Sequence, residues 1–444
     1  MRTGLPIITL AVCAAAVLAT GGGGCSPTEK DDQPAGVFYF PTSITVHPGQ
    51  RYAYVVNSNF DLGYKTGTIK VLDLQELESE ILADASGTGC GGRTCAATHF
   101  TGAIVEPATL KIGNFGGTAA LDPTASRLFV SLRQDGMVAL ADVGEEGRAL
   151  DCRGGTVDTP DSQPGSFIGD CHKGRLYKTG YDDPFTLAWG PNPAALGGGC
   201  VYAAHLRTGV ITCLDVSAPA GDTPAVAFVA DFSRGLTPSG VNDFFFDAGG
   251  RLYAANRYLL DGSNVIGAAD PASMLANPGS AWWFDVAYVV GAAEQKSLLL
   301  TKDGGTLYLL GKGPDALVKM VLGADAYGTP TLDAIDYVPA GVWPERLFMF
   351  ENAVPARRFV YVTCTDNDYI HVFDGNTLEQ VAQLRDGFDG PYWMAFYDLG
   401  TGPRALVANF ENSTVAVVAI DPVTMAHRTV AVVGAPRKKA SGEY

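Results

Sequence analysis

The sequence of 444 residues has few charged side chains and few histidines for its length. Asp, Glu, Lys and Arg together make up 18% of the chain, which is below the quarter that is usual for soluble proteins. The six histidines stand singly, and the sequence has neither an H-E-x-x-H motif nor a paired C-x-x-C spacing. Those patterns would predict a zinc site, so we expect no resident metal and no other cofactor.

Positive charge is also scarce. Lys and Arg number 31 against 47 Asp and Glu, which gives a net charge of −16. Such a surface repels phosphate backbones, so nucleic-acid binding is not expected. The sequence also lacks a P-loop and a G-x-S-x-G elbow, the motifs that would predict phosphate binding or a serine hydrolase.

What the chain does have is glycine, proline and apolar residues, with 54 Gly, 26 Pro and 47% hydrophobic residues. Many turn formers between apolar runs favour an all-β protein. The segment from Arg358 to Asp374, RFVYVTCTDNDYIHVFD, illustrates the pattern. Its two apolar runs flank a polar turn of Asp and Asn, which predicts a β-hairpin.

This hairpin recurs seven times along the chain. The matched positions lie 75, 73, 51, 55, 53 and 45 residues apart, at Tyr54, Phe129, Tyr202, Tyr253, Tyr308, Tyr361 and Leu406. A further short strand precedes and follows each copy, which gives four strands per repeat. Four antiparallel strands repeated seven times predict a seven-bladed β-propeller, which we place at residues 37–436. Residues 437–444 are expected to form a solvated tail.

Three of the copies carry a family resemblance. The segments YVVNSN, YVTCTDNDYIHVFD and ALVANFENSTVAVVAID resemble the YVTN β-propeller repeat. The resemblance implies the propeller architecture and leaves the function open, because propellers host many functions.

The N-terminus has the features of an export signal. A positive start and a short apolar run precede Cys25, and this arrangement predicts a signal peptide at residues 1–24. The placement of Cys25 after small residues resembles the bacterial lipoprotein signal, which implies a lipidated cysteine and a membrane anchor. Ser26 after that cysteine implies the outer membrane. Residues 25–36 would then be a flexible tether. Simple secretion with Cys25 unmodified is the alternative.

Topology predicts where a ligand would bind. In an alternating meander, the loops before the first strand and between the second and third strands share one face around the central channel. Polar and aromatic side chains that converge on a concavity favour a binding site. The candidates on these loops are Asp183, Asn242, Asp243, Glu345, Arg346, Asp389, Tyr392 and Trp393. The same face is expected to carry His205, Arg207, Asn256, Arg257, Asp366 and Glu411. A solvated rim without a ligand is the alternative.

The first two repeats contain enlarged loops, at about residues 76–106 and 144–174. Both should emerge on the face opposite the channel mouth and touch each other. Because a propeller does not need such loops to close, we expect them to form a partner-binding surface; loops without a partner are the alternative. Each loop holds two cysteines, and we expect disulfides within the loops, although the spacing leaves the connectivity open. The expected pairs are Cys90–Cys95 and Cys152–Cys171. The strand cysteines are expected to be small buried hydrophobic residues; they are Cys200, Cys213 and Cys364.

Two functions fit these features. The first is an envelope-anchored binding platform for another envelope protein, a polysaccharide or a small ligand. The second is a hydrolase that resembles the seven-bladed lactonases and uses carboxylates and a histidine on the channel face. A plugged channel would favour the first function, and convergent acids with a histidine within hydrogen-bond reach would favour the second.

Overall fold

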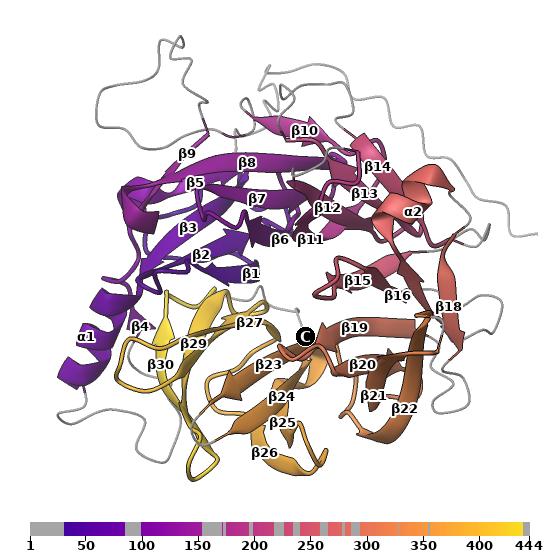
Figure 1. The fold of residues 1–444 in the computed structure, drawn as a ribbon. Coiled ribbons are helices and arrows are strands. Elements are labelled where there is room, and N and C mark those ends of the chain that lie inside the picture. Colours follow the sequence, from indigo (N-terminus) through magenta and orange to yellow (C-terminus); the bar gives the residue numbers. More distant parts are fainter. Residues whose placement is uncertain are drawn as a thin grey trace, which may run out of the picture.

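The seven repeats fold into seven sheets, each built on four antiparallel strands, and the sheets are arranged in a ring (Figure 1). The predicted all-β, seven-bladed propeller is confirmed. The computed structural model describes residues 31–437 apart from 85–98, 153–170, 172–174, 195–198, 217–225, 234–239, 258–264, 278–279, 286–293, 327 and 354–355. Within these residues, no helix has the length and apolar character needed to cross a membrane.

Each blade uses four strands in chain order, with β4 (His99–Phe100) and β9 (Ala149–Asp151) inserted before the fourth strand of blades 1 and 2. The first three blades consist of β1 (Pro41–Val46), β2 (Tyr52–Asn57), β3 (Gly67–Asp73) and β5 (Leu110–Ile112); β6 (Gly116–Leu121), β7 (Arg127–Leu132), β8 (Met137–Gly144) and β10 (Leu176–Lys178); and β11 (Pro184–Pro191), β12 (Gly199–His205), β13 (Val210–Leu214) and β14 (Val226–Asp231).

The last four blades follow the same order. They consist of β15 (Val241–Phe246), β16 (Leu252–Asn256), β17 (Val265–Ala269) and β18 (Trp282–Asp285); β19 (Glu294–Leu300), β20 (Thr306–Lys312), β21 (Ala316–Ala324) and β22 (Pro330–Pro339); β23 (Arg346–Asn352), β24 (Arg357–Cys364), β25 (Tyr369–Asp374) and β26 (Gln380–Leu384); and β27 (Pro391–Tyr397), β28 (Arg404–Asn409), β29 (Thr414–Asp421) and β30 (Ala426–Val433). A short helix, α2 (Pro271–Ala276), follows β17.

The repeat positions that identify the blades are core residues. All seven lie on the second strand of their blade and are 0% exposed: Tyr54, Phe129, Tyr202, Tyr253, Tyr308, Tyr361 and Leu406. A second strand has a neighbouring strand on both edges and a neighbouring blade on both faces, so its large side chains are fully enclosed. The buried tyrosine hydroxyls still need partners. Tyr202, for example, donates to the carbonyl of Pro191 at 2.6 Å.

The first strands of neighbouring blades contact one another around the whole ring, including β1 against β27. The last blade and the first are the two ends of the propeller, so the chain does not run directly from one to the other. The first enlarged loop bridges this seam. Its helix α1 (Leu74–Asp84) and short strand β4 (His99–Phe100) lie against blade 7 (Figure 1), and β4 adds a parallel fifth strand to β30.

A buried carboxylate strengthens the seam. Glu78 on α1 accepts hydrogen bonds from Tyr397 at 2.8 Å, Thr401 at 3.1 Å and Arg404 at 3.1 Å. Apolar residues around it, including Leu77 and Ile104, belong to one cluster with blades 1 and 7. The first loop therefore contributes contacts that join blade 1 to blade 7, in addition to those between β1 and β27.

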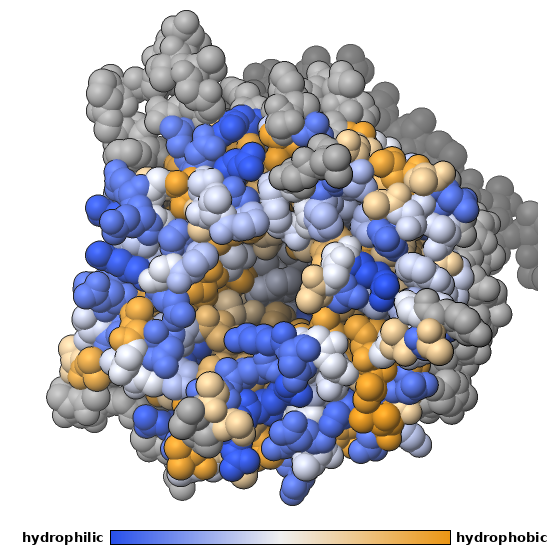
Figure 2. Space-filling model, in the orientation of Figure 1, coloured by the Kyte–Doolittle hydropathy of each residue, from blue (hydrophilic) through white to orange (hydrophobic). Residues whose placement is uncertain are grey.

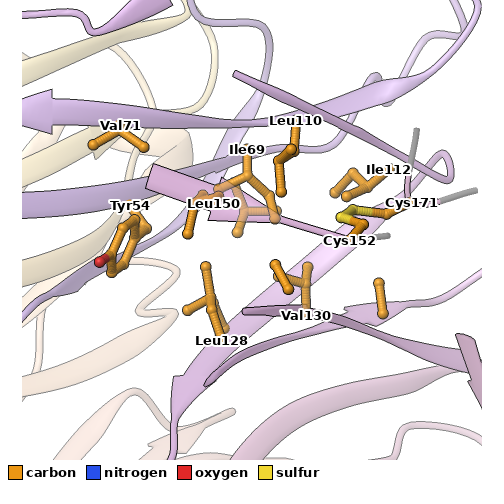
Figure 3. Packing of buried hydrophobic residues seen from close by; sticks show 14 of the residues in the cluster. Tyr54, Ile69, Val71, Leu110, Ile112, Leu128, Val130, Leu150, Cys152 and Cys171 are labelled. Carbon is orange, nitrogen blue, oxygen red and sulfur yellow. A yellow bond between two sulfur atoms is a disulfide. The ribbon is translucent and has the colours of Figure 1, made fainter. Parts of the chain in front are cut away.

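The second enlarged loop packs at the junction of blades 1 and 2 (Figure 3). Its strand β9 (Ala149–Asp151) extends β8 as a hairpin. Cys152 and Cys171 form a disulfide, the pair that we expected for this loop, and both are buried. Val105 from the first loop packs against the cluster that contains this disulfide, so the two loops share one apolar core. Cys90 and Cys95 lie outside the described residues.

One expectation about the strand cysteines is wrong. Cys200 on β12 and Cys213 on β13 form a second disulfide, with Cα atoms 5.7 Å apart, whereas we expected both to be unpaired. The strands are antiparallel neighbours, and their register places Tyr202 opposite Cys213, which brings the two sulfurs to adjacent positions. Cys364 is buried and free, as expected.

Both ends of the propeller are held more firmly than the sequence indicated. Residues 31–36, which we assigned to the flexible tether, lie against blade 1. The Nζ of buried Lys70 donates to the carbonyl of Pro34 at 3.2 Å and pairs with Glu106 at 3.1 Å. A buried ammonium needs such partners. At the other end, the backbone N–H of Arg437 donates to Asn412 at 2.7 Å, so this first residue of the assigned tail is also bound.

Candidate functional site

The loops expected to surround the channel do meet at one end of it. The start of each first strand pairs with the end of the second, as Pro41 with Asn57 and Pro391 with Asn409. The centre of the ring is hollowed (Figure 2). A cavity of about 330 Å³ opens at this end, and we call it the mouth. All seven blades contribute to its lining: Thr42, Ser58, Phe60, Phe115, Gly116, Arg133, Phe185, Arg257, Lys296, Glu345, Thr365, Asp366, Tyr392, Phe410 and Glu411.

One half of the mouth is aromatic. Blades 7, 1, 2 and 3 supply its five rings: Tyr392, Phe410, Phe60, Phe115 and Phe185. The ring centroid of Phe60 lies 5.7 Å from that of Phe115 and 5.4 Å from that of Phe410. Aromatic pairs at these separations stabilise each other. Phe60 nevertheless stays 48% exposed, so a large apolar surface faces the solvent beside the cavity.

The other half, from blades 4 to 6, carries a network of paired charges. The Nζ of Lys296 lies 3.3 Å from Glu294 and 3.0 Å from Glu345. Arg257 approaches Glu294 at 3.6 Å, and Lys312 approaches Glu345 at 3.7 Å. The side chain of Lys296 is only 12% exposed, so this network is partly shielded from water, which strengthens it relative to a surface ion pair.

The channel below the mouth is plugged. Arg346 on β23 is 4% exposed, and its guanidinium lies over the rings of Phe185 at 4.5 Å and Trp393 at 5.2 Å. One of its nitrogens is 3.7 Å from the carboxylate of Asp243. Since these partners belong to blades 3, 7 and 4, the side chain spans the channel. The indole of Trp393 donates to the carbonyl of Ile44 at 3.0 Å, which fixes the plug to blade 1.

Asp243 is part of the channel wall and not of the mouth. Its carboxylate accepts from the hydroxyl of Ser297 at 2.6 Å and from the backbone N–H of Leu298 at 3.2 Å. Burial raises the pKa of this carboxyl group, while the nearby Arg346 opposes the shift. A carboxyl group with these partners holds blade 4 against blade 5 and is enclosed by protein.

The predicted candidates therefore separate into three groups. Glu345 and Tyr392 line the mouth. Asp243, Arg346 and Trp393 form the plug or its support. The remaining three serve as connections: the amide of Asn242 donates to Gln295 at 2.6 Å, Asp183 pairs with Arg133 at 2.7 Å, and the backbone carbonyl of Asp389 accepts from Glu411 at 3.2 Å.

Most of the aromatic half was missed by the sequence analysis, namely Phe60, Phe115 and Phe410. A signal for two of them was available in the repeat itself. Phe60 and Phe410 each follow an asparagine, Asn59 or Asn409, near the hairpin turn of their blades. Such turns lie on the face of the mouth, so aromatic residues in them could have been added to the candidates.

The only histidine predicted on this face is sealed. His205 is 0% exposed, and its two ring nitrogens lie 3.0 Å from the carbonyl of Asp182 and 3.0 Å from the hydroxyl of Thr212. Burial lowers the pKa of His205 to about 4, so the ring is neutral at physiological pH. The described residues that line the mouth include no histidine, and none of them forms the carboxylate–histidine pair expected of a hydrolase.

Comparison of the sequence with known families and proteins identifies no relative. No protein-family model matches the sequence, and no curated protein was found to be related to it. The resemblance to the YVTN repeat thus rests on the quoted segments alone.

Solved structures do match. Hydrazine synthase from Kuenenia stuttgartiensis aligns at 12% identity over 87% of this chain and 97% of that chain, with a TM-score of 0.53. A periplasmic gluconolactonase from Pseudomonas aeruginosa aligns at 14% identity over 87% and 98%, also with a TM-score of 0.53. At these identities the likeness concerns the propeller fold.

Proposed function

We propose that this propeller is a binding protein whose mouth holds a compact, uncharged, polyhydroxylated ligand of the sugar class. The observation that carries the proposal is the division of the mouth into an aromatic half and a charged half. A sugar ring has apolar C–H faces and a rim of hydroxyl groups. Its faces can stack on aromatic rings while each hydroxyl both donates and accepts hydrogen bonds.

The charge of the mouth favours a neutral ligand. Its lining holds three cations, Arg133, Arg257 and Lys296, and three carboxylates, Glu345, Asp366 and Glu411. An ionic ligand would have to compete with pairs that already exist, such as Lys296 with Glu345. A hydroxyl group can instead accept from the ammonium and donate to the carboxylate without separating them.

The size of the mouth also fits. A volume of about 330 Å³ lies at the lower end of the range of about 300–1,000 Å³ that is typical of small-molecule sites. A single sugar ring is a ligand of suitably small size. The plug formed by Arg346 and Trp393 sets the depth of the site and prevents a ligand from threading the channel.

Saturation-transfer NMR with glucose, galactose, mannose and N-acetylglucosamine tests the proposal. We expect at least one of these sugars to receive saturation from the wild-type protein and to lose it in Phe410→Ala. Tyr337→Ala is the matched control, because Tyr337 is an aromatic residue on β22 that is 56% exposed and does not line the mouth. The absence of transfer to all four sugars would contradict the proposal.

A second candidate function is hydrolysis of a cyclic sugar ester, as in a lactonase. It is favoured by the three carboxylates of the mouth and by the gluconolactonase among the structural neighbours. The absence of histidine from the described lining argues against it. Acid release from glucono-δ-lactone, followed in a pH-stat, distinguishes the two functions. If the protein is a lactonase, the wild type should release acid faster than the spontaneous reaction does. This rate of acid release should fall in Glu345→Gln or Asp366→Asn.

We further propose that the protein is exported and anchored in the outer membrane through a lipidated Cys25. Two disulfides, Cys152–Cys171 and Cys200–Cys213, support an oxidising compartment. Cys25→Ala should move the protein from the membrane fraction to the soluble fraction. Continued association of that variant with the membrane would contradict the lipid anchor.

A further inference from the structure

A second hollow lies beside the mouth. It has a volume of about 450 Å³ and is lined by Phe60, Phe115, Arg133, Gln134, Asp182, Asp183 and Arg207. Phe60, Phe115 and Arg133 also line the mouth, so these three residues form a shared wall. The two cavities are therefore neighbouring parts of one surface depression, and they adjoin over blades 1 and 2.

The shared wall offers an apolar surface between the hollows. Phe60 is 48% exposed although it contacts Phe115 and Phe410. The guanidinium of Arg133 lies 5.2 Å from the ring centroid of Phe185 and is fixed by Asp183 at 2.7 Å. An exposed aromatic side chain that its neighbours hold in place gives a ligand stacking area at a low entropic cost.

The second hollow has the same chemistry as the mouth. Its lining contains two guanidinium groups, Arg133 and Arg207, and two carboxylates, Asp182 and Asp183, together with the amide of Gln134. The charges again balance, and the two phenylalanines of the wall again supply the apolar surface. A ligand that fits one hollow by its chemistry therefore fits the other.

We infer that the ligand is an oligosaccharide, with its terminal ring in the mouth and its next rings over the Phe60–Phe115 wall and in the second hollow. This inference rests on the proposed function. The plug at Arg346 closes the channel, so the chain has to leave the mouth sideways. The shared wall is the side on which a second cavity of matching chemistry is present.

Calorimetric titration of the mature protein with chains of increasing length tests the inference. The probes are glucose with its cello- and malto-oligosaccharides, and N-acetylglucosamine with its chitooligosaccharides. In at least one series, we expect the trisaccharide to bind at least ten times more tightly than the monosaccharide. The double variant Gln134→Ala/Arg207→Ala should reduce that ratio to about one, whereas Arg428→Ala, at an exposed position on β30, should preserve it.

The outcomes separate this inference from the proposed function. Binding of a monosaccharide without any gain from longer chains would overturn the extended site and leave the sugar-binding mouth intact. A gain that persists in the double variant would show that the chain leaves the mouth in another direction, and this also overturns the inference. Failure of every saccharide to bind would overturn both proposals. Thermal unfolding of each variant checks that it is folded.

Discussion

The two enlarged loops look alike in the sequence but stabilise different kinds of junction. Both leave the third strand of their blade, and both pack at the junction with the preceding blade. The second loop lies where the chain itself connects the blades, from β5 to β6. The first loop lies at the seam between blades 7 and 1, where no chain connection exists, and it supplies the bridge.

The chemistry of the two loops follows this difference. The first loop uses contacts that reach across the seam: a parallel strand pair with β30 and the hydrogen bonds of Glu78. The second loop uses an internal staple, Cys152–Cys171, and an apolar core. Insertions of similar length and position can therefore have different roles, and of the two it is the first that spans the seam.

The largest effect should come from breaking the seam. Glu78→Ala leaves the guanidinium of Arg404 and the hydroxyl of Tyr397 buried without their carboxylate, and the side chains of Glu78 and Arg404 are only 6% and 14% exposed. Loss of one partner of a buried ion pair costs about 3 kcal/mol or more. We expect the free energy of unfolding to fall by about that amount in urea titrations of the mature protein.

A matched variant on the same helix provides the control. Glu76 is exposed on α1, and Glu76→Ala should change the free energy of unfolding by less than about 0.5 kcal/mol. Equal effects of the two substitutions would mean that α1 contributes only its helical structure and that the Glu78 contacts do not hold the seam.

The second effect concerns the staple. Cys152 and Cys171 are 19 residues apart, and a disulfide that closes such a loop contributes about 3 kcal/mol on the chain-entropy model. The double variant Cys152→Ala/Cys171→Ala should therefore lower the free energy of unfolding by up to that amount. It should also leave the seam closed, so proteolysis should cut the second loop first. Initial cleavage in the first loop would remove the distinction between the two loops.

Local patterns in the sequence predict the blades and the face of the mouth, but they do not predict the seam. The blades could be predicted because the repeat positions, such as Tyr54 and Tyr361, lie on fully enclosed second strands, where burial imposes a strong pattern. The face of the mouth could be predicted because strand alternation determines which loops lie together. The seam could not be predicted, since Glu78 and Arg404 are over three hundred residues apart and no local pattern joins them.

The details of the candidate site depended on tertiary geometry in the same way. The guanidinium of Arg346 lies over the ring of Trp393. This contact depends on how two different blades sit in the ring, which no local pattern in the sequence specifies. The disulfide between Cys200 and Cys213 depended on strand register, which apolar residues on both faces of a strand leave poorly specified.

The third effect, from acid, should act outside both loops. Burial in blade 3 lowers the pKa of His205 from its ordinary 6.5 to about 4. The imidazole therefore binds a proton more tightly in the unfolded chain than in the folded protein. The contribution of the neutral ring to the free energy of unfolding is fully present above pH 6.5 and is lost as the pH falls toward 4. At pH 5 the expected loss is about 2 kcal/mol relative to pH 7.

Urea titrations of the wild type and of His205→Asn at pH 7 and pH 5 isolate this loss, because burial also lowers the pKa of His427 to about 4 and that ring adds to the wild-type difference. In His205→Asn the difference between the two values should shrink by about 2 kcal/mol, whereas in Glu78→Ala it should match the wild type. A Glu78→Ala variant with a smaller loss would indicate that acid opens the seam, and the two regions would then be coupled.

The smallest effect tests how the second loop is tied to blade 1. The hydroxyl of Tyr54 donates to the carbonyl of Gly147, at the start of that loop, at 2.8 Å. Tyr54→Phe removes this hydrogen bond and should cost about 1 kcal/mol. Tyr202→Phe is the matched control, because its hydroxyl bonds to Pro191 within blade 3 and should cost about the same.

A double-mutant cycle shows which of the two tyrosine hydroxyls is coupled to the Cys152–Cys171 disulfide. If the staple holds the loop against Tyr54, the cost of Tyr54→Phe should fall by about 0.5 kcal/mol or more once Cys152 and Cys171 are alanine. The cost of Tyr202→Phe should stay unchanged in that background, because its hydroxyl donates to Pro191 within blade 3. Strict additivity for Tyr54 would mean that β9 and the apolar core position the loop without help from the disulfide.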